Sequence, residues 1–449
     1  MKFKDKHLNE VCSAQSRRGI SRRELLSIAG GLAALYPIGR LAGVFGKRLD
    51  LIDEVERRAC LYFWEQAHPD TGLVLDRAAT DRPNPLSVAT NIASIAATGF
   101  GLSALAISSS RGYLRHADAR ARAQLTLECL IGHVAGKNGF FYHFLDVLTG
   151  DRCYECEVSS VDTAWLLCGV IHARQHFDTP AIRRLADEIL ARVDWKWMWA
   201  GGPTLCHGWT PEGGFLPYRW DRYSELLAMY LLAMASDSHP IPPSAWNAWT
   251  RPRQKNLAAG HVFIESSAPL FAHQYSHAWF DFRGLRDGSI DYFENSRLAT
   301  VLHREFCVDL RGRFPWFSEV MWGITSSESR YGYIDWGGLN AAANSRIDGT
   351  LVPCAAGGSI VFLPGNCTQV LETMLERYGN KCWTRYGFVD AFHPLNWRAP
   401  DVVGINLGIM LLMAENHRTE SVWKAMMAAP EVQRGLEAAR FTKNEGLDG

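Results

Sequence analysis

The sequence predicts an all-α fold in which paired helices close into a ring. Apolar and amphipathic segments with helical spacing recur from Leu51 to beyond Trp423, and every other connection between them is a long loop rich in aromatic residues. Strand signals are few and short, and no alternation of strands with helices indicates a parallel sheet. A closed ring fits this pattern best, with the long loops gathered at one end, where function usually resides.

The expected elements follow the chain in order. The first helix, residues 51–66, places Ile52, Val55 and Phe63 on one face and ends at a turn cluster. Short extended pieces are expected at residues 73–77 and 139–146, the second of which could also be a loop. Further helices are expected at residues 91–107, 120–134, 161–172, 180–192, within 220–234, at 292–308, 369–378 and 403–415, and from Trp423 onward. The segments 201–218, 263–291 and 315–333 are expected to be mainly irregular.

The charges of the 449-residue chain balance, with 47 Lys and Arg against 47 Asp and Glu. This balance argues against a nucleic-acid partner, and no basic amphipathic segment indicates a membrane surface. The 16 tryptophans suit either a ligand groove lined by flat rings or an ordinary core. No low-complexity linker divides residues 50–440, so we expect one domain, residues 46–449, acting as a monomer.

Residues 1–45 are predicted to be a twin-arginine export signal and linker. Arg22 and Arg23 precede an apolar run from Leu25 to Ile38. This run is too short and too rich in glycine to indicate a membrane-spanning helix. The alternative is an N-terminal amphipathic helix. The signal predicts a periplasmic or secreted protein without stable membrane insertion after the signal is removed.

The eleven cysteines are irregularly spaced, and Cys153 and Cys156 form a lone Cys-x-x-Cys pair. No second pair or nearby histidine cluster completes a zinc site, so no metal is expected there. A local disulfide stays possible in an oxidising compartment.

A polar, aromatic stretch from Trp220 to Glu225 leads into an apolar segment that is predicted to be a buried helix. Glu225 lies where this helix would begin, and the helix dipole favours a negative charge there. A carboxylate flanked by Trp220 and Tyr223, with Arg222 close by, also suits sugar binding and acid–base chemistry. The alternative is an N-terminal charge without a chemical role.

An ordered set of motifs resembles the bacterial glycoamylase-like family, whose characterised members include endo-β-1,2-glucanases. The motifs are Tyr62-Phe63-Trp64-Glu65, Gly72-Leu73, Asp76-Arg77, Gly139-Phe140-Phe141-Tyr142-His143-Phe144, Ser160-Val161-Asp162-Thr163-Ala164, Tyr223-Ser224-Glu225, His277-Ala278-Trp279-Phe280-Asp281, Asn295-Ser296-Arg297, Trp322-Gly323-Ile324-Thr325, Asp348-Gly349-Thr350, Tyr386-Gly387-Phe388-Val389-Asp390-Ala391-Phe392, Gly404-Ile405-Asn406 and Glu415-Asn416. They extend from about Leu51 to the Trp423 region.

The resemblance implies an (α/α)6 barrel and the hydrolysis of a β-glucan with inversion, without a metal or cofactor. It marks Glu225 as the general acid, Asp390 as the general base and Asp162 as a third acidic residue of the pocket. Asp162 could instead cap a helix. The sequence departs from the usual pattern at His393, beside the expected base, where asparagine would be typical.

The remaining candidate substrate-binding residues are aromatic platforms and hydrogen-bonding groups, each of which could also be ordinary core or surface. They are Trp220, Arg222, Tyr223, His277, Trp279, Asp281, Arg297, Trp322, Phe392 and Trp397. The glycine-rich segment 357–365 lacks the spacing of a phosphate loop, and no Gly-x-Ser-x-Gly elbow indicates a serine hydrolase.

The expected substrate is β-1,2-glucan or its oligosaccharides. Two other function classes stay open: a transglycosylase on the same scaffold, and a non-catalytic glycan-binding protein that kept the cleft. The carboxyl groups disfavour the second class, whereas the sequence does not separate hydrolysis from transglycosylation, because water access depends on loop shape.

Overall fold

The computed structural model describes residues 50–80, 91–255, 262–265, 269–288, 290–339 and 341–443. The described residues group into a single compact unit. The predicted export signal, with Arg22 and Arg23, lies outside the described residues.

An inner ring of helices lies at the centre of the fold. Its members are α2 (Ile95–Ser110), α4 (Ser160–Phe177), α7 (Leu227–Ala235), α8 (Tyr275–Trp279), α10 (Pro353–Gly357) and α12 (Gly404–Arg418). Helix α2 packs against α4 and α12, α7 packs against α4 and α8, and α12 also contacts α8 and α10. Nearly every residue of α2, α4 and α7 is buried, as expected for helices that are apolar around their whole circumference.

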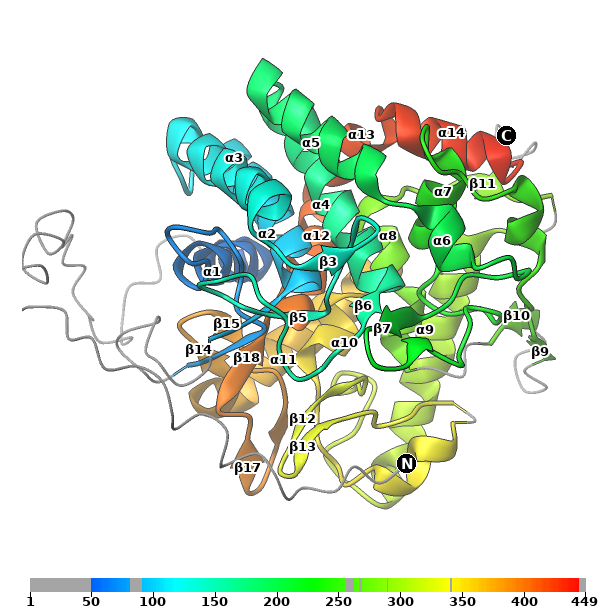
Figure 1. The fold of residues 1–449 in the computed structure, drawn as a ribbon. Helices are drawn as coiled ribbons and strands as arrows, with labels where there is room; N and C mark the ends of the chain where they lie inside the picture. Colours follow the sequence, from blue (N-terminus) through cyan, green and yellow to red (C-terminus); the bar gives the residue numbers. More distant parts are fainter. Residues whose placement is uncertain are drawn as a thin grey trace, which may run out of the picture. The chain divides into compact units, whose positions relative to one another are not determined.

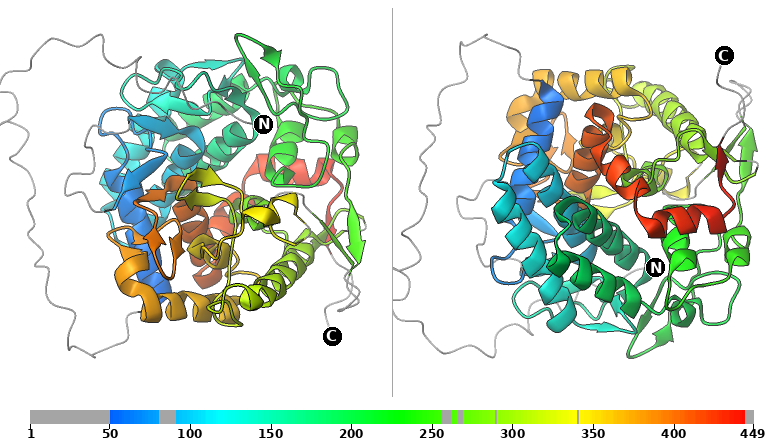
Figure 2. Two further views of the ribbon diagram at one scale, coloured as in Figure 1. Left: turned by 90° about the horizontal axis from the view of Figure 1, so that it is seen from below. Right: turned by 90° about the horizontal axis from the view of Figure 1, so that it is seen from above.

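Outer helices alternate with the inner ones along the chain and cover them (Figure 2). They are α1 (Leu51–Glu65), α3 (His116–Gly132), α5 (Pro180–Arg192), α9 (Tyr292–Asp309) and α11 (Pro364–Cys382), while α14 (Pro430–Ala438) packs on α7. Helix α5 shows the amphipathic pattern clearly, because its buried residues recur at helical spacing, with Ile182, Leu185 and Ile189 facing inward. This all-α (α/α)6 barrel is the predicted fold (Figure 1).

Short strands gather where the inner helices begin. Strand β2 (Ile92–Ser94) leads directly into α2, β6 (Val158–Ser159) into α4, and β18 (Asp401–Val403) into α12. Each pairs antiparallel with a strand from elsewhere in the chain: β2 with β5 (Phe144–Asp146), β6 with β7 (Gly208–Thr210), and β18 with β1 (Arg77–Ala79). These pairs anchor the loops at the N-terminal end of the inner ring.

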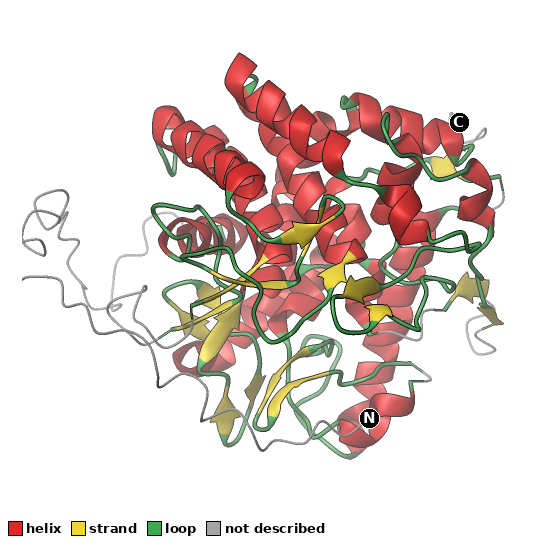
Figure 3. Cartoon of the chain, viewed as in Figure 1, coloured by secondary structure: helices red, strands yellow, loops and turns green. Residues whose placement is uncertain are grey.

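The remaining strands are also short, and helices dominate the described chain (Figure 3). They are β3 (Gly136–Lys137), β4 (Phe140–Phe141), β8 (Gly214–Phe215), β9 (Arg253–Lys255), β10 (Val262–Ile264), β11 (Leu285–Arg286), β12 (Ser327–Ser329), β13 (Gly332–Ile334), β14 (Trp383–Thr384), β15 (Gly387–Phe388), β16 (Phe392–His393), β17 (Trp397–Arg398) and β19 (Thr442–Lys443). Pairing β12–β13 and β16–β17 makes two hairpins that matter for the site.

The predicted long helices are confirmed, with shifted ends. The helix expected from residue 91 begins at Ile95, because Ser94 accepts a hydrogen bond from the backbone N–H of Ala97 and caps it. Helices α6 (Trp195–Trp199), α8 and α10 were missed, because five residues are too few to show a helical period. The closing helix expected from Trp423 divides into α13 (Ser421–Met427) and α14.

At the opposite end of the ring, where α12 ends and α1 begins, ion pairs connect these helices and the end of α2. Arg418 pairs with Asp53 and Glu56, and Arg111 pairs with Glu415. Among the described residues, no helix combines the length and apolar character needed to cross a bilayer.

The close approach of α2 and α4 depends on two glycines. A Cβ added at Gly169 would lie 2.1 Å from the carbonyl oxygen of Gly99, and one at Gly99 would lie 2.5 Å from that of Trp165. The opposing atoms belong to the backbone and cannot move aside independently, so both positions require glycine.

We expect Gly169→Ala to lower the free energy of unfolding by about 1–3 kcal/mol or more, because the added methyl group forces the two helices apart. Chemical denaturation measures this change. Gly132→Ala is the matched control, since a Cβ at this last residue of α3 meets nothing within 4 Å. Equal stability of the two variants would contradict the packing argument.

Candidate active site

The three predicted acidic residues lie at the end of the barrel where the inner helices begin. Asp162 lies in the first turn of α4, and Glu225 lies two residues before α7 begins. Asp390 follows β15 and is held by Asn406, in the first turn of α12. The starts of α4, α7 and α12 therefore each bring one part of the site to this end.

Helix α8 connects the environments of Glu225 and Asp390 through two consecutive residues. The Tyr275 hydroxyl donates a hydrogen bond of 3.1 Å to Asn406 Oδ1, and Asn406 Nδ2 donates one of 2.7 Å to Asp390 Oδ1. The next residue, Ser276, donates a hydrogen bond of 2.9 Å to the backbone carbonyl of Glu225. Burial, with the charges of both carboxylates contributing, raises the pKa of Tyr275 well above its usual value. The structure therefore brings the two predicted catalytic residues to one site.

Asp390 is buried, and both of its carboxylate oxygens accept hydrogen bonds. Oδ1 accepts from Asn406, and Oδ2 accepts from the backbone N–H of Glu328 at 2.6 Å. Burial raises the pKa of Asp390 to about 7, although these two hydrogen bonds stabilise the charged form and oppose the shift. The carboxyl group is therefore poised to ionise near neutral pH, with its oxygens already oriented.

The donor to Asp390 is held in place by an ion pair. Glu328 lies in β12, and its carboxylate pairs with Arg77, which also bonds Asp76 at 2.9 Å. Arg77 lies in β1, the strand that pairs with β18 at the entrance to α12. One strand pair thus positions both the Arg77–Glu328 contact and the helix that carries Asn406.

Glu225 has a different environment. Its pKa is raised to about 7, mainly by burial and further by the negative charge of Asp162, while its own backbone N–H opposes the shift. Only 9% of the residue is exposed. Because a nearby negative charge and burial both favour the neutral form, Glu225 is suited to carry a proton at neutral pH.

Asp162 is the third residue of α4 and belongs to an ion-pair triad. Ser159, not Asp162, caps α4, because Ser159 Oγ accepts the backbone N–H of Asp162 at 3.2 Å and donates to the Asp162 carboxylate; the capping alternative for Asp162 is therefore wrong. His143 Nε2 lies 3.7 Å from Asp162 Oδ1, and His143 Nδ1 lies 3.2 Å from Glu157 Oε1. Burial lowers the pKa of His143, but the two carboxylates outweigh it and raise the pKa to about 9.

The same three residues offer ligand atoms that lie within 4.8 Å of one another, close enough to hold a metal ion. The raised pKa of His143 favours a protonated imidazole, which donates rather than coordinates. One imidazolium then pairs with two carboxylates, so the triad of His143, Glu157 and Asp162 keeps a net negative charge near Glu225.

Several other predicted residues lie beside these carboxylates. The Trp220 indole stacks on His207 at 3.9 Å and donates to Ser160 Oγ at 2.8 Å, two residues before Asp162. Phe392 is buried in β16, two residues after Asp390, and Trp397 lies in the paired strand β17. Arg222 is exposed three residues before Glu225. Tyr223 is buried, and its hydroxyl lies 3.2 Å from His273 Nδ1, so it packs the chain next to Glu225 rather than facing a ligand.

Two of the proposed tryptophan platforms do not agree with the structure. Trp279 is fully buried, with its indole donating to Ser103 at 2.9 Å and its ring against Phe100 at 4.5 Å. Trp322 is also fully buried, near His303. Neither ring can stack on a sugar, because both side chains are fully buried. The sequence could not distinguish buried tryptophans from those at the cleft.

Three predicted hydrogen-bonding residues, His277, Arg297 and Asp281, make contacts with residues other than the three acidic ones. His277 is buried and bonded to Ser296 at 3.0 Å, and burial lowers its pKa to about 3. Arg297 pairs with Glu294 on α9.

Asp281 pairs with Arg283, which reaches Glu420 just beyond the end of α12. The 15 residues of α12 span about 22 Å. Asp281 is therefore at the opposite end of the barrel from Asn406, and its substrate-binding assignment is wrong.

His393, the departure from the usual pattern beside Asp390, has a local role. Its Nδ1 accepts the backbone N–H of Leu395 at 3.2 Å, and its ring contacts Trp316 at 5.0 Å. His393 therefore stabilises the β16–β17 turn. Its ring contacts Trp316 and not Asp390.

The sequence alone indicates no role for five residues of the site: Arg77, His143, Tyr275, Glu328 and Asn406. Three of them stand in the motifs that carry the resemblance, so their presence there was a signal. Tyr275 and Glu328 lie in segments expected to be irregular, and nothing in their local pattern indicates the contacts they make.

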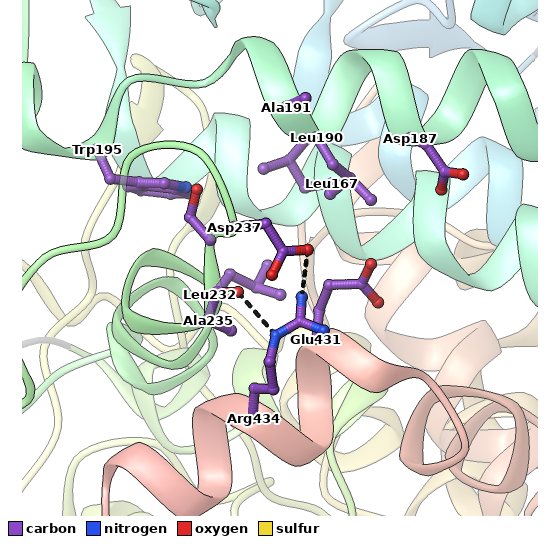
Figure 4. A pocket seen from close by; sticks show the side chains of 11 residues that line it. Leu167, Asp187, Leu190, Ala191, Trp195, Leu232, Ala235, Asp237, Glu431 and Arg434 are labelled. Atoms are coloured by element: carbon purple, nitrogen blue, oxygen red, sulfur yellow. Dashed lines mark hydrogen bonds and ion pairs between the residues drawn. The ribbon is translucent and has the colours of Figure 1, made fainter.

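A separate cavity of about 110 Å³ lies among α4, α5, α7 and α14 (Figure 4). None of Asp162, Glu225 and Asp390 lines it. Arg434 reaches across it, donating to the Ala235 carbonyl at 3.2 Å and pairing with Asp237 at 2.9 Å. This cavity is a packing gap between helices, filled in part by the Arg434 side chain.

Comparisons with known proteins agree with this fold. The model of a family described as "putative glucoamylase" matches residues 217–430, which include Glu225 and Asp390. The resemblance of this chain to the glycoamylase-like family is thereby confirmed.

The chain is 25% identical over 431 residues to an exo-β-1,2-glucooligosaccharide sophorohydrolase of Parabacteroides distasonis, with 88% of this chain aligned. It spans only 58% of the length of that curated relative. An endo-β-1,2-glucanase from Chitinophaga pinensis, solved with sophorotriose and glucose, has a TM-score of 0.79 and 27% identity, covering 88% of this chain and 98% of that one. A "putative glucoamylase" from Bacteroides fragilis has a TM-score of 0.79 and 29% identity, covering 90% and 99%.

Proposed function

We propose that this protein is a glycoside hydrolase that cleaves β-1,2-linked glucan or its oligosaccharides by an inverting general acid–base mechanism. The observation that carries the proposal is a pair of buried carboxyl groups at one end of the barrel, each with a pKa raised to about 7. Glycoside hydrolysis requires such a pair, one carboxyl to protonate the leaving oxygen and one to activate water.

Glu225 is assigned as the acid. Burial and the charge of Asp162 keep its carboxyl group protonated up to about pH 7, so it can donate a proton to the glycosidic oxygen as the bond breaks. After the reaction, the ionised Glu225 recovers its proton from solvent.

Asp390 is assigned as the base. Both oxygens already accept hydrogen bonds from Asn406 and Glu328, an arrangement that suits the ionised form. Each oxygen keeps a further lone pair that could accept a proton from the attacking water. The raised pKa makes Asp390 a stronger base than an exposed aspartate, while it still ionises near neutral pH.

The linkage follows from the two named relatives, whose printed activities concern β-1,2-linked glucooligosaccharides and glucan. The proposed partner is therefore a β-1,2-glucan chain, bound by a monomer. Product analysis separates hydrolysis from transglycosylation, because only hydrolysis adds one reducing end for each bond cleaved.

We expect Glu225→Gln and Asp390→Asn each to reduce turnover of β-1,2-glucan by at least about 10²–10⁴-fold, because each removes one proton-transfer group. The release of reducing ends measures turnover, and thin-layer chromatography of the products shows whether glucosyl units reach water or another sugar.

Glu294→Gln and Asp118→Asn are matched controls, since both carboxylates form salt bridges with a neighbouring arginine on the outer helices α9 and α3. They should keep parental turnover. The role of either carboxyl is falsified if its amide variant retains near-parental turnover.

We also propose that the protein is exported by the twin-arginine route to the periplasm or the exterior. The support is the Arg22-Arg23 pair followed by a short, glycine-containing apolar run. Replacing both arginines with lysine should leave the protein in the cytoplasmic fraction. Lysine at Arg17 and Arg18 is the control, and it should leave export unchanged. An unaltered distribution of the Arg22/Arg23 variant would contradict the proposal.

A further inference from the structure

Half of the exposed large apolar side chains in the described residues lie in two hairpins next to Asp390. The full set in the described residues is Leu148, Tyr154, Tyr218, Tyr331, Tyr333 and Leu395. They lie in loops and hairpins, away from the outer helices that cover the barrel. Three of them, Tyr331, Tyr333 and Leu395, belong to the β12–β13 and β16–β17 hairpins that flank Asp390.

The β12–β13 hairpin places its tyrosines next to Asp390. Glu328, whose backbone N–H bonds Asp390, is the register partner of Tyr333 across the hairpin. Residues directly opposite in an antiparallel pair project from the same face. Tyr333 and Glu328 therefore share one face. Tyr331 lies in the two-residue turn between the strands and is 91% exposed, while Tyr333 is 42% exposed.

A second contact fixes the position of this hairpin. Arg330, in the same turn, donates a hydrogen bond to Asn396, between β16 and β17. Strand β16 begins two residues after Asp390, so both hairpins are tied to the chain that carries the proposed base. Leu395, 71% exposed, lies beside Asn396. The two hairpins therefore lie side by side next to Asp390, joined by the Arg330–Asn396 hydrogen bond.

The electrostatics agree with this placement. The pKa of Tyr333 is raised well above its usual value by partial desolvation of the phenol and then by the charge of Asp390, although 42% of the residue stays exposed. Tyr333 thus lies opposite Glu328, on the part of the hairpin next to Asp390, and Tyr331 lies in the turn at the tip of the same hairpin.

An exposed tyrosine at 91% exposure buries almost no surface and adds little to folding stability. Flat aromatic rings provide large, rigid contact area at low entropic cost and a polar hydroxyl at the edge. The C–H faces of pyranose rings can pack on such a surface. The hairpin also contacts the proposed base directly, through the hydrogen bond from Glu328 to Asp390.

We propose that Tyr331 and Tyr333 form a sugar-binding platform on the Asp390 side of the site, which holds glucosyl units of the chain beyond the cleaved bond. This inference rests on the proposed glucanase function and names the part of the site that recognises longer chains. The platform makes long β-1,2-glucan a better substrate than the shortest oligosaccharide that the protein cleaves.

The test compares the parent with the Tyr331→Ala/Tyr333→Ala double variant on two substrates, long β-1,2-glucan and the shortest β-1,2-linked oligosaccharide that the parent cleaves. We expect KM for the long chain to rise by about tenfold, the effect of losing about 1.4 kcal/mol of aromatic contact, with kcat little changed. KM for the short oligosaccharide should stay within about twofold of the parent, a change of less than 0.5 kcal/mol.

The Tyr331→Phe/Tyr333→Phe variant is the matched control, because it keeps both rings and should keep most of the affinity for the long chain. Thermal unfolding of all variants checks that the fold is intact. Equal changes in KM for both substrates, or none for either, would overturn the platform while leaving the glucanase function standing. A parent that cleaves no β-1,2-glucan overturns the proposed function, and the platform with it.

Discussion

Burial of two carboxyl groups without a dedicated cationic partner is the constraint on which the rest of this structure depends. Water would hold Glu225 and Asp390 ionised at neutral pH, whereas the barrel removes that water and supplies neutral donors. Folded Glu225 has a pKa of about 7 against the usual 4.5, so the folded state binds the proton more tightly than the unfolded chain does. Its protonation favours folding fully below about pH 4.5, and this contribution is lost as pH rises to about 7.

At alkaline pH, keeping Glu225 buried costs the fold on the order of 3 kcal/mol, since each pKa unit corresponds to about 1.4 kcal/mol. The packing of the inner ring offsets this cost. Its helices are buried around their circumference, and α2 and α4 meet at the Gly99–Gly169 contact, which no larger residue allows. The packing that stabilises the barrel extends along the lengths of α2, α4 and α12. The fold can therefore tolerate the buried carboxyl groups at one end of these helices.

The sequence predicted the long elements well because their apolar residues repeat with a helical period over many turns, as in α1, α5 and α9. It failed at α8 and α10, which are five residues long, yet α8 supplies Tyr275 and Ser276 to the centre of the site. Glu225 and Asp390 could be singled out because each stands in a recognisable motif. The direction of a side chain could not be predicted: Trp279 and Trp220 look alike in the sequence, but one is sealed by Phe100 and the other stacks on His207.

The central claim is that Glu225 carries a proton at neutral pH. Carbon-13 NMR of the protein labelled at glutamate side-chain carboxyls measures this most directly, with the Glu225→Gln variant used to assign the missing resonance. The account predicts that this resonance titrates near pH 7, and that Asp162→Asn moves the midpoint to lower pH, because Asp162 contributes to the raised value. A midpoint close to the ordinary glutamate value of about 4.3 would contradict the account.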